Sequence, residues 1–225
     1  MTAPAQHGPL PRLLIGLTVV TGLVDAFSYL TLGHVFVANM TGNVVFFGFA
    51  LAGVGEVSAF ASLLAVVAFA AGAALGGRLA REPRPHRGYL LAAACSVQAV
   101  PMLASAIVVA VAGTGLTVTR MVLIALLAAA MGGQNAVVRR LGVPDLTTTV
   151  LTLTVTGLVA DASPAPVRVR RVLAVLAMVL GAFIGGVLLR WVAPSAPLWL
   201  AAALLLGCAA GGYASARSPR SAVWR

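Results

Sequence analysis

Eight apolar stretches, separated by short polar loops, make up most of the chain. They run over residues 12–31, 35–53, 57–77, 89–112, 120–138, 146–160, 171–190 and 197–214. A helix needs about 20 consecutive apolar residues to cross a bilayer, and six of the stretches are ordinary candidates. The pattern therefore predicts an all-α integral membrane protein with six transmembrane helices.

The stretches at 35–53 and 146–160 are poor candidates for simple spans. The first has two asparagines, a threonine and a glycine near its start, and the second is short and holds six threonines. Irregular or polar backbone at membrane depth is tolerated only where it is buried in protein or lines a wet cavity. We therefore expect both to be re-entrant or broken segments.

An internal repeat appears when the chain is compared with itself at an offset of 109 residues. Five glycine pairs coincide, and GAALGG at 72–77 is matched by GAFIGG at 181–186. With one residue of slippage, Gly22, Asp25 and Ala26 also fall on Gly132, Asn135 and Ala136. The common order of these matches favours duplication over chance in a Gly- and Ala-rich chain. The single membrane domain, 1–225, thus divides into repeat one at 12–112 and repeat two at 120–214.

Arginine positions discriminate between two topologies, because Lys and Arg in short loops favour the cytoplasmic side. If all eight stretches span, the arginines divide seven inside to eight outside, and there is no bias. If 35–53 and 146–160 re-enter, only Arg120 and Arg190 remain outside. This scheme gives an inverted 3+3 repeat, typical of transporters, with both termini in the cytoplasm. If 35–53 spanned the membrane, only Arg12 would move to the outside. The prediction that this segment re-enters therefore rests more on the symmetry of the repeats than on charge.

The composition excludes a water-soluble domain. Hydrophobic residues make up 60% of the chain and charged residues 9%, and the mean hydropathy is +1.03. The net charge of +10 comes from arginines in loops beside apolar stretches, which indicates membrane topology and contact with membrane lipids rather than with nucleic acid. Asp25 disfavours a cleaved signal peptide at the first stretch. We expect a multi-pass protein of the bacterial cytoplasmic (inner) membrane.

Nothing in the pattern indicates an enzyme, a cofactor or a metal site. With five acidic residues and three histidines, the sequence offers no Ser–His–Asp set, carboxylate pair or phosphate loop. Cys95 and Cys208 lie singly in apolar stretches, away from other metal ligands. They predict neither a disulfide framework nor a zinc site.

The candidate functional residues are polar groups in the two irregular segments and in the helix before each one. They are Asp25, Asn39, Thr41, Asn43, Gln134, Asn135, Thr148, Thr149, Thr152 and Thr154. Amides and hydroxyls beside a glycine suit the end of a half-helix that binds an ion or a small polar solute. For an ionisable group inside a membrane helix, such as Asp25, function is the default hypothesis. The structural alternative is that these groups bond neighbouring helices, with Asp25 accepting from a backbone donor or from His34.

Two functions remain open from the sequence. The leading hypothesis is a small secondary transporter or channel for a small polar solute or ion, which passes the candidate residues. The other is a non-transporting membrane scaffold whose Arg-rich faces bind lipid or a partner. The small residues of GAALGG and GAFIGG indicate close helix contacts, compatible with a homodimer and equally with packing within one chain.

Two stretches of the chain carry a family resemblance. GLVDAFSYLTLGHVFVANMTGNVVFFG at 22–48 contains VFVANMTGN, and GGQNAVVRRLGVPDLTTTVLTLTVTG at 132–157 adds QNA and TTTVLT in matching order. In these motifs, and over nearly the whole length, the chain resembles the YoaK family of small bacterial membrane proteins. Leu153 departs from the TGT that the family often has, so the second segment is not a strict mirror of Thr41 and Gly42. The resemblance implies about six membrane helices and no established activity.

Overall fold

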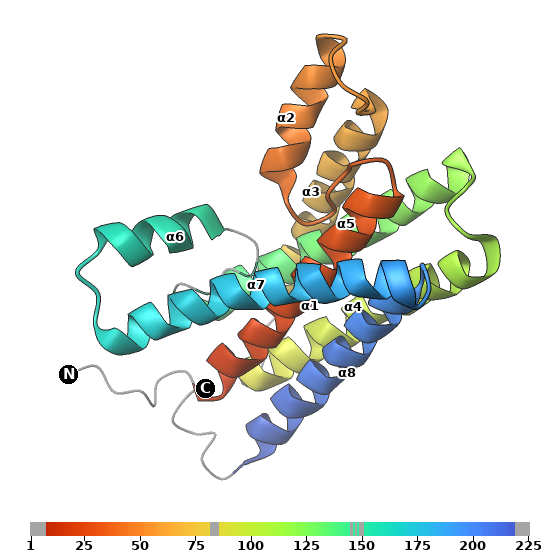
Figure 1. Cartoon of the computed structure of the whole chain (residues 1–225). Helices are drawn as coiled ribbons and strands as arrows, with labels where there is room; N and C mark the ends of the chain where they lie inside the picture. Colours follow the sequence, from red (N-terminus) through yellow and green to blue (C-terminus); the bar gives the residue numbers. More distant parts are fainter. Residues whose placement is uncertain (1–7, 82–85, 145, 147, 149–150, 219–225) are drawn as a thin grey trace.

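The computed structural model describes residues 8–81, 86–144, 146, 148 and 151–218, and within them it is entirely helical, without strands (Figure 1). The helices are α1 (Leu10–Thr31), α2 (Met40–Leu51), α3 (Ala59–Arg81), α4 (Arg87–Ala112), α5 (Thr117–Leu141), α6 (Leu151–Ala160), α7 (Ala165–Trp191) and α8 (Ala196–Arg217). Six of them, all but α2 and α6, are long and apolar enough to cross a membrane. The predicted all-α architecture with six transmembrane helices is confirmed at this level.

Each predicted stretch corresponds to one helix. The seventh begins six residues earlier than predicted, at Ala165, and the second and sixth each begin five residues later, at Met40 and Leu151. The stretch predicted at 35–53 becomes helical only at Met40, where Asn39 is the N-cap and its side chain accepts from the Gly42 amide at 3.4 Å. The preceding residues are held in a loop because the amides of Val37 and Ala38 donate to a side chain of α1 rather than to a helix ladder. An apolar pattern alone cannot reveal such a bond.

Two helix pairs, α1 with α7 and α3 with α5, form the closest contacts of the bundle. A Cβ added to Gly22 would lie 2.5 Å from the Met178 carbonyl oxygen, and one added to Gly76 would lie 2.8 Å from the Gly133 Cα. Added Cβ atoms at Gly72 and Gly181 would likewise overlap backbone atoms of α5 and α1. The contacts advance in the same sense along both partners, so each pair is parallel. The GAALGG and GAFIGG motifs thus pack helices within one chain.

The ends of the helices show which way each one runs. Cys208, in the second half of α8, has its Sγ 3.7 Å from the Leu13 carbonyl oxygen at the start of α1. An added Cβ on Gly212 of α8 would lie 3.0 Å from the Gly88 oxygen at the start of α4, and Arg87 donates to the carbonyl of Leu141 at the end of α5. The starts of α1 and α4 and the ends of α5 and α8 therefore lie at one end of the bundle, which we call the Arg87 end.

The two short helices each connect long helices whose ends meet at the same end of the bundle. Since α3 returns to the Arg87 end, α2 lies between the end of α1 and the start of α3 at the opposite end. Since α7 is parallel to α1, α6 lies between the end of α5 and the start of α7 at the Arg87 end. In Figure 1, α2 folds back beside α3 and α6 folds back beside α7.

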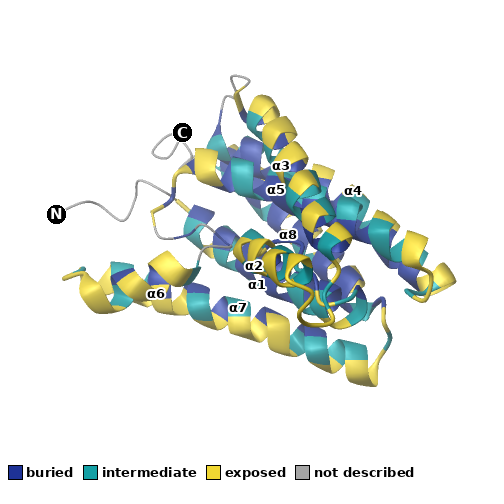
Figure 2. Cartoon of the chain, turned by 90° about the horizontal axis from the view of Figure 1, so that it is seen from above, coloured by how far each residue is buried: buried dark blue, intermediate teal, exposed yellow. Residues whose placement is uncertain are grey.

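Burial separates central from peripheral helices. Of the long helices, α1 and α5 are the most buried, whereas α3 and α7 are the least. Figure 2 shows exposed residues along the outer faces of α3, α6 and α7. Large apolar side chains such as Phe60, Val67, Leu176 and Phe183 are exposed there, as expected of helices that face lipid.

Candidate functional site

A cavity of about 1330 Å³ lies among α1, α2, α3, α5, α6 and α7. Its wall includes five of the residues predicted as functional from the sequence: Asp25, Asn39, Thr41, Asn135 and Thr152. They come from both repeats and are up to 127 positions apart, from Asp25 to Thr152. The fold thus brings the start of each short helix to one hollow.

Asp25 both lines this cavity and anchors the loop before α2. Its Oδ1 accepts hydrogen bonds from the amides of Val37 and Ala38 at 3.0 and 2.8 Å. Asp25 thus bonds to backbone donors, which is one of the two structural partners considered from the sequence. The other, His34, packs its ring edge-on against Tyr29 at a centroid distance of 5.1 Å. The carboxyl group in this position holds the residues just before α2 and also lies on the cavity wall.

Asn43 has a different place from its neighbours Asn39 and Thr41. The side chains of Asn39 and Thr41 are exposed on the cavity wall. Asn43 is fully buried, accepts from the Phe36 amide at 3.0 Å and donates to the Phe36 carbonyl at 2.6 Å. It lies outside the cavity lining and closes the loop into α2, so its observed bonds are structural.

Gln134 lies outside the cavity lining, beside Asn135, and belongs to a buried hydrogen-bond network. Its Oε1 accepts from Gln98 at 2.7 Å, and its Nε2 donates to the hydroxyls of Thr21 and Thr148 at 3.2 and 3.3 Å. Asn135, by contrast, lines the cavity and donates to the Met131 carbonyl at 3.1 Å. The network joins α1, α4 and α5 to the segment before α6, which is the use expected of polar groups that hold helices together.

The remaining threonines divide in the same way. Thr152 is exposed on the cavity wall. Thr154 is buried in α6 and is not part of the lining, and Thr148 belongs to the network with a φ of 58°. Thr149 lies outside the described residues. Of the second segment's predicted hydroxyls, Thr152 is thus the one that the structure places at the cavity.

Sequence reasoning missed an aromatic wall on the side of the cavity next to α2. Tyr29 stacks on Phe36 at 4.9 Å between ring centroids, and Phe36 stacks on Phe46 at 5.9 Å. All three residues line the cavity together with Asp25. Their separation along the chain gives no single periodic signal, because they come from a helix, a loop and the next helix.

Comparison of the sequence with known proteins shows the family to which the chain belongs. Residues 13–224 match the family model described as "Protein of unknown function (DUF1275)". The UPF0700 transmembrane protein YoaK of Bacillus subtilis (strain 168) is 32% identical over 163 residues, which cover 72% of this chain and 70% of that protein. This chain belongs to the DUF1275 family. The predicted YoaK-like relationship is confirmed, and no solved structure matches.

This DUF1275 chain is therefore a multi-pass membrane protein. Its VFVANMTGN stretch, on which the resemblance was based, forms the loop and the helix start that Asp25 and Asn43 hold in place. Within the described ranges, no group of three or more His, Cys, Asp or Glu side chains is arranged to hold a metal ion.

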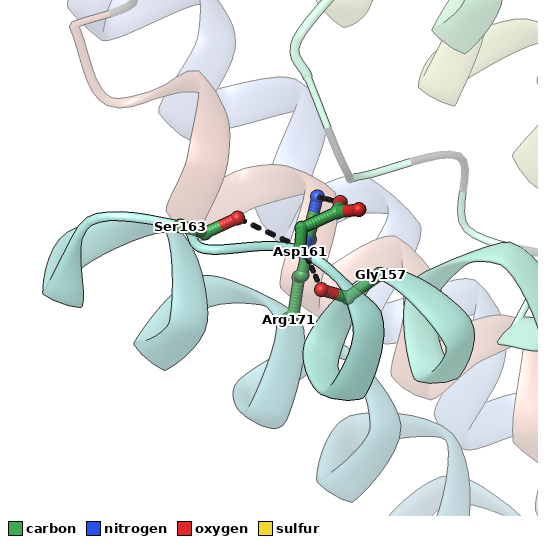
Figure 3. Close-up of polar contacts among 4 residues, drawn as sticks. All are labelled: Gly157, Asp161, Ser163 and Arg171. Atoms are coloured by element: carbon green, nitrogen blue, oxygen red, sulfur yellow. Dashed lines mark hydrogen bonds and ion pairs between the residues drawn. The ribbon is translucent and has the colours of Figure 1, made fainter.

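A buried arginine, also missed as such from the sequence, fastens α6 to α7 in this family member (Figure 3). Arg171 forms an ion pair with Asp161 at 2.9 Å and donates to Ser163 Oγ at 3.1 Å and to the Gly157 carbonyl. Its side chain is 9% exposed, against 54% for Asp161. The arginine counted from the sequence as a topology marker thus also closes the α6–α7 hairpin.

Proposed function

We propose that this protein is a small secondary transporter or channel, not an enzyme, which moves a small polar solute or ion through the cavity. Its two three-helix halves are inverted relative to each other, and α2 and α6 are re-entrant. It lies in the bacterial cytoplasmic membrane with both termini in the cytoplasm.

Equivalent glycine contacts support the two-fold relation between the halves. A Cβ on Gly22 would meet Met178 O and Ala182 N, and one on Gly132 would meet Phe69 O and Ala73 N. The α1 and α5 positions differ by 110 residues, and the α7 and α3 positions differ by 109. One interface thus reproduces the other at the atomic level, as duplicated halves would.

Helix length and direction support re-entry by the short helices. With 12 and 10 residues, α2 and α6 are far shorter than the roughly 20 residues that a helical span requires. Each one connects two long helices at one end of the bundle, α2 at the end opposite to Arg87 and α6 at the Arg87 end. Two such segments entering from opposite faces fit inverted repeats.

Charge supports the orientation. The described arginines at the Arg87 end include Arg78, Arg81, Arg139, Arg168 and Arg217, while Arg120 and Arg190 lie at the other end. Because arginine in short loops favours the cytoplasmic side, the Arg87 end faces the cytoplasm.

The observation that carries the proposal is the position of the cavity. It contains Asp25 and its repeat equivalent Asn135, and it receives residues from the starts of both short helices, Asn39 of the first and Thr152 of the second. Transporters with discontinuous helices bind their substrates at such junctions. The scaffold alternative is favoured by a different observation: Gln134, Thr148 and Asn43 are all bonded within the protein.

The two functions differ in whether water reaches the cavity. In a Cys95→Ala, Cys208→Ala background, single cysteines would replace Asn39, Thr41 and Thr152, with lipid-facing Phe183→Cys as the control. A membrane-impermeant thiol reagent, applied to intact cells and to inverted vesicles, should label positions 39 and 41 from outside and 152 from inside, but not 183. Absence of labelling at all three cavity positions from either side would instead leave a dry scaffold.

A further inference from the structure

The half of the cavity next to α2 combines one carboxyl group with three aromatic rings. Asp25 contributes the carboxylate, and Tyr29, Phe36 and Phe46 contribute three rings in mutual contact. Aromatic faces attract cations through the ring quadrupole, and a carboxylate adds direct charge attraction. Of the described lining residues, Asp25 is the only acidic one.

The other charged lining residue, Arg139, lies in the opposite half of the cavity. Asp25 is six residues before the end of α1, and Arg139 is two residues before the end of α5. Thr21 of α1 accepts a hydrogen bond from Gln134 of α5 at 3.2 Å, so these two residues lie at about the same level. Since α1 and α5 run in opposite directions, a rise of 1.5 Å per residue places Asp25 and Arg139 on opposite sides of that level, roughly 13 Å apart along the axis. Within the described residues Arg139 forms no ion pair with Asp25, so the guanidinium group does not occupy the α2 half.

The size of the cavity argues for an organic solute rather than a bare metal ion. At about 1330 Å³ it exceeds the volume of a dehydrated ion many times over and is above the roughly 300–1,000 Å³ typical of small-molecule sites. Apolar side chains such as Leu30, Met40, Val45 and Met178 complete its wall. An apolar wall suits a carbon skeleton, whereas a hard cation such as Ca²⁺ needs a shell of oxygen ligands that this wall does not supply.

From these features we infer that the α2 half of the cavity binds an organic cation, a protonated amine or a quaternary ammonium compound. The cationic nitrogen lies between Asp25 and the rings of Tyr29, Phe36 and Phe46, and the carbon skeleton extends along the apolar wall. Asn39 and Thr41 are available to any hydroxyl or amide group that the solute carries. This inference rests on the transport function proposed above and narrows its substrate to one chemical class.

The test is equilibrium binding to the purified full-length protein in lipid nanodiscs, measured by calorimetry. The probes share one ring and differ in charge: benzyltrimethylammonium, benzyl alcohol and benzenesulfonate. We expect the cation to bind at least about tenfold more tightly than the neutral and anionic probes. Equal affinities, preference for the anion, or no binding of the cation would overturn the inference.

Matched variants locate the binding. Asp25→Asn should weaken cation binding by roughly 10- to 100-fold, whereas Glu56→Gln, at an exposed acid outside the lining, should not change it. Phe46→Leu should weaken it by about 3- to 10-fold, and Phe49→Leu, on α2 but outside the lining, should leave it unchanged. Cation binding that ignores both Asp25→Asn and Phe46→Leu would refute the site. If Asp25→Asn fails to fold, the Phe46 and Phe49 pair decides alone.

The cysteine-labelling experiment separates failure of this inference from failure of the transport proposal. A cavity that is labelled from both faces but shows no preference for the cation would overturn the substrate class and leave transport standing. Selective, Asp25-dependent binding in a protein whose cavity is labelled from neither face would uphold the cation site and overturn transport.

Discussion

The glycines that face neighbouring backbones allow a test of the helix contacts on which the bundle depends. Gly72 and Gly77 are both in α3 and belong to the same GAALGG motif. A Cβ at Gly72 would overlap the backbone of Ala129 in α5, whereas a Cβ at Gly77 would have no atom within 4 Å. Gly72→Ala and Gly77→Ala are thus the same chemical change in two different surroundings.

The expected difference in stability between the two variants follows from one energy contribution that they share and one that only Gly72→Ala has. Replacing glycine by alanine inside a helix gains about 0.5–1 kcal/mol from backbone entropy, and this gain is common to both variants. Gly72→Ala alone must push α3 away from α5, and such overpacking costs about 1–3 kcal/mol. Because the overlapped atoms are backbone, no side-chain rotation can relieve the contact, so the upper part of this range applies.

The assay is thermal unfolding of the purified protein in one detergent. For a chain of this size, about 1 kcal/mol shifts the midpoint by roughly 2–4 °C, so Gly72→Ala should unfold several degrees below Gly77→Ala. The repeat equivalents provide an internal replicate: Gly181→Ala should behave like the first and Gly186→Ala like the second, since Gly186 also has open space. Equal midpoints within either pair would refute the packing argument.

Three further predictions concern the polar contacts and can be measured by the same unfolding assay. Asp25→Asn keeps an acceptor for Val37 and Ala38 and should retain wild-type stability, whereas Asp25→Ala leaves two amides without their acceptor and should cost about 1–3 kcal/mol; similar midpoints for the two would show that the loop does not need this acceptor. Arg171→Ala should cost about 1–3 kcal/mol and speed proteolysis between α6 and α7, while Asp161→Asn, at the half-exposed partner, should cost under about 1 kcal/mol; the reverse order would contradict the burial of the arginine. Gln134→Leu should lower the free energy of unfolding by about 1–3 kcal/mol. Because Gln98 and Gln134 share one hydrogen bond, the double variant with Gln98→Leu should lose less stability than the sum of the two single variants; strict additivity would argue against that bond.

Much of the architecture could be predicted because a bilayer imposes a simple length rule on the sequence. Six stretches long enough to span became long helices, and the two with polar starts became short ones. Arginine positions and the glycine repeat add two predictions that hydropathy lacks, namely the orientation of the bundle and which segments are equivalent. The glycine motifs predict close helix contacts, and in the structure Gly72 and Gly181 lie against the backbones of neighbouring helices.

The sequence predicts which segments form the candidate site but not which of their side chains face the cavity. In a soluble helix the polar face marks the outside, but a membrane helix has apolar residues on both its lipid face and its buried face, so its rotation is not evident from the pattern. Asn43 and Gln134 were therefore grouped with Asn39 and Asn135, although their side chains lie away from the cavity. Nor did the pattern reveal that Arg171 is buried.

The two short helices are fastened to the bundle by different contacts. In repeat one, Asp25 holds the residues just before α2. Before α6, Thr148 accepts from Gln134, and at the end of α6 Arg171 reaches Gly157 and Asp161. The equivalent of Arg171 in repeat one is Ser62, whose side chain is too short for such a contact. The contact of Arg171 with Gly157 and Asp161 thus has no counterpart at position 62, so its loss should loosen α6 against α7 and leave the packing of α2 on α3 unchanged.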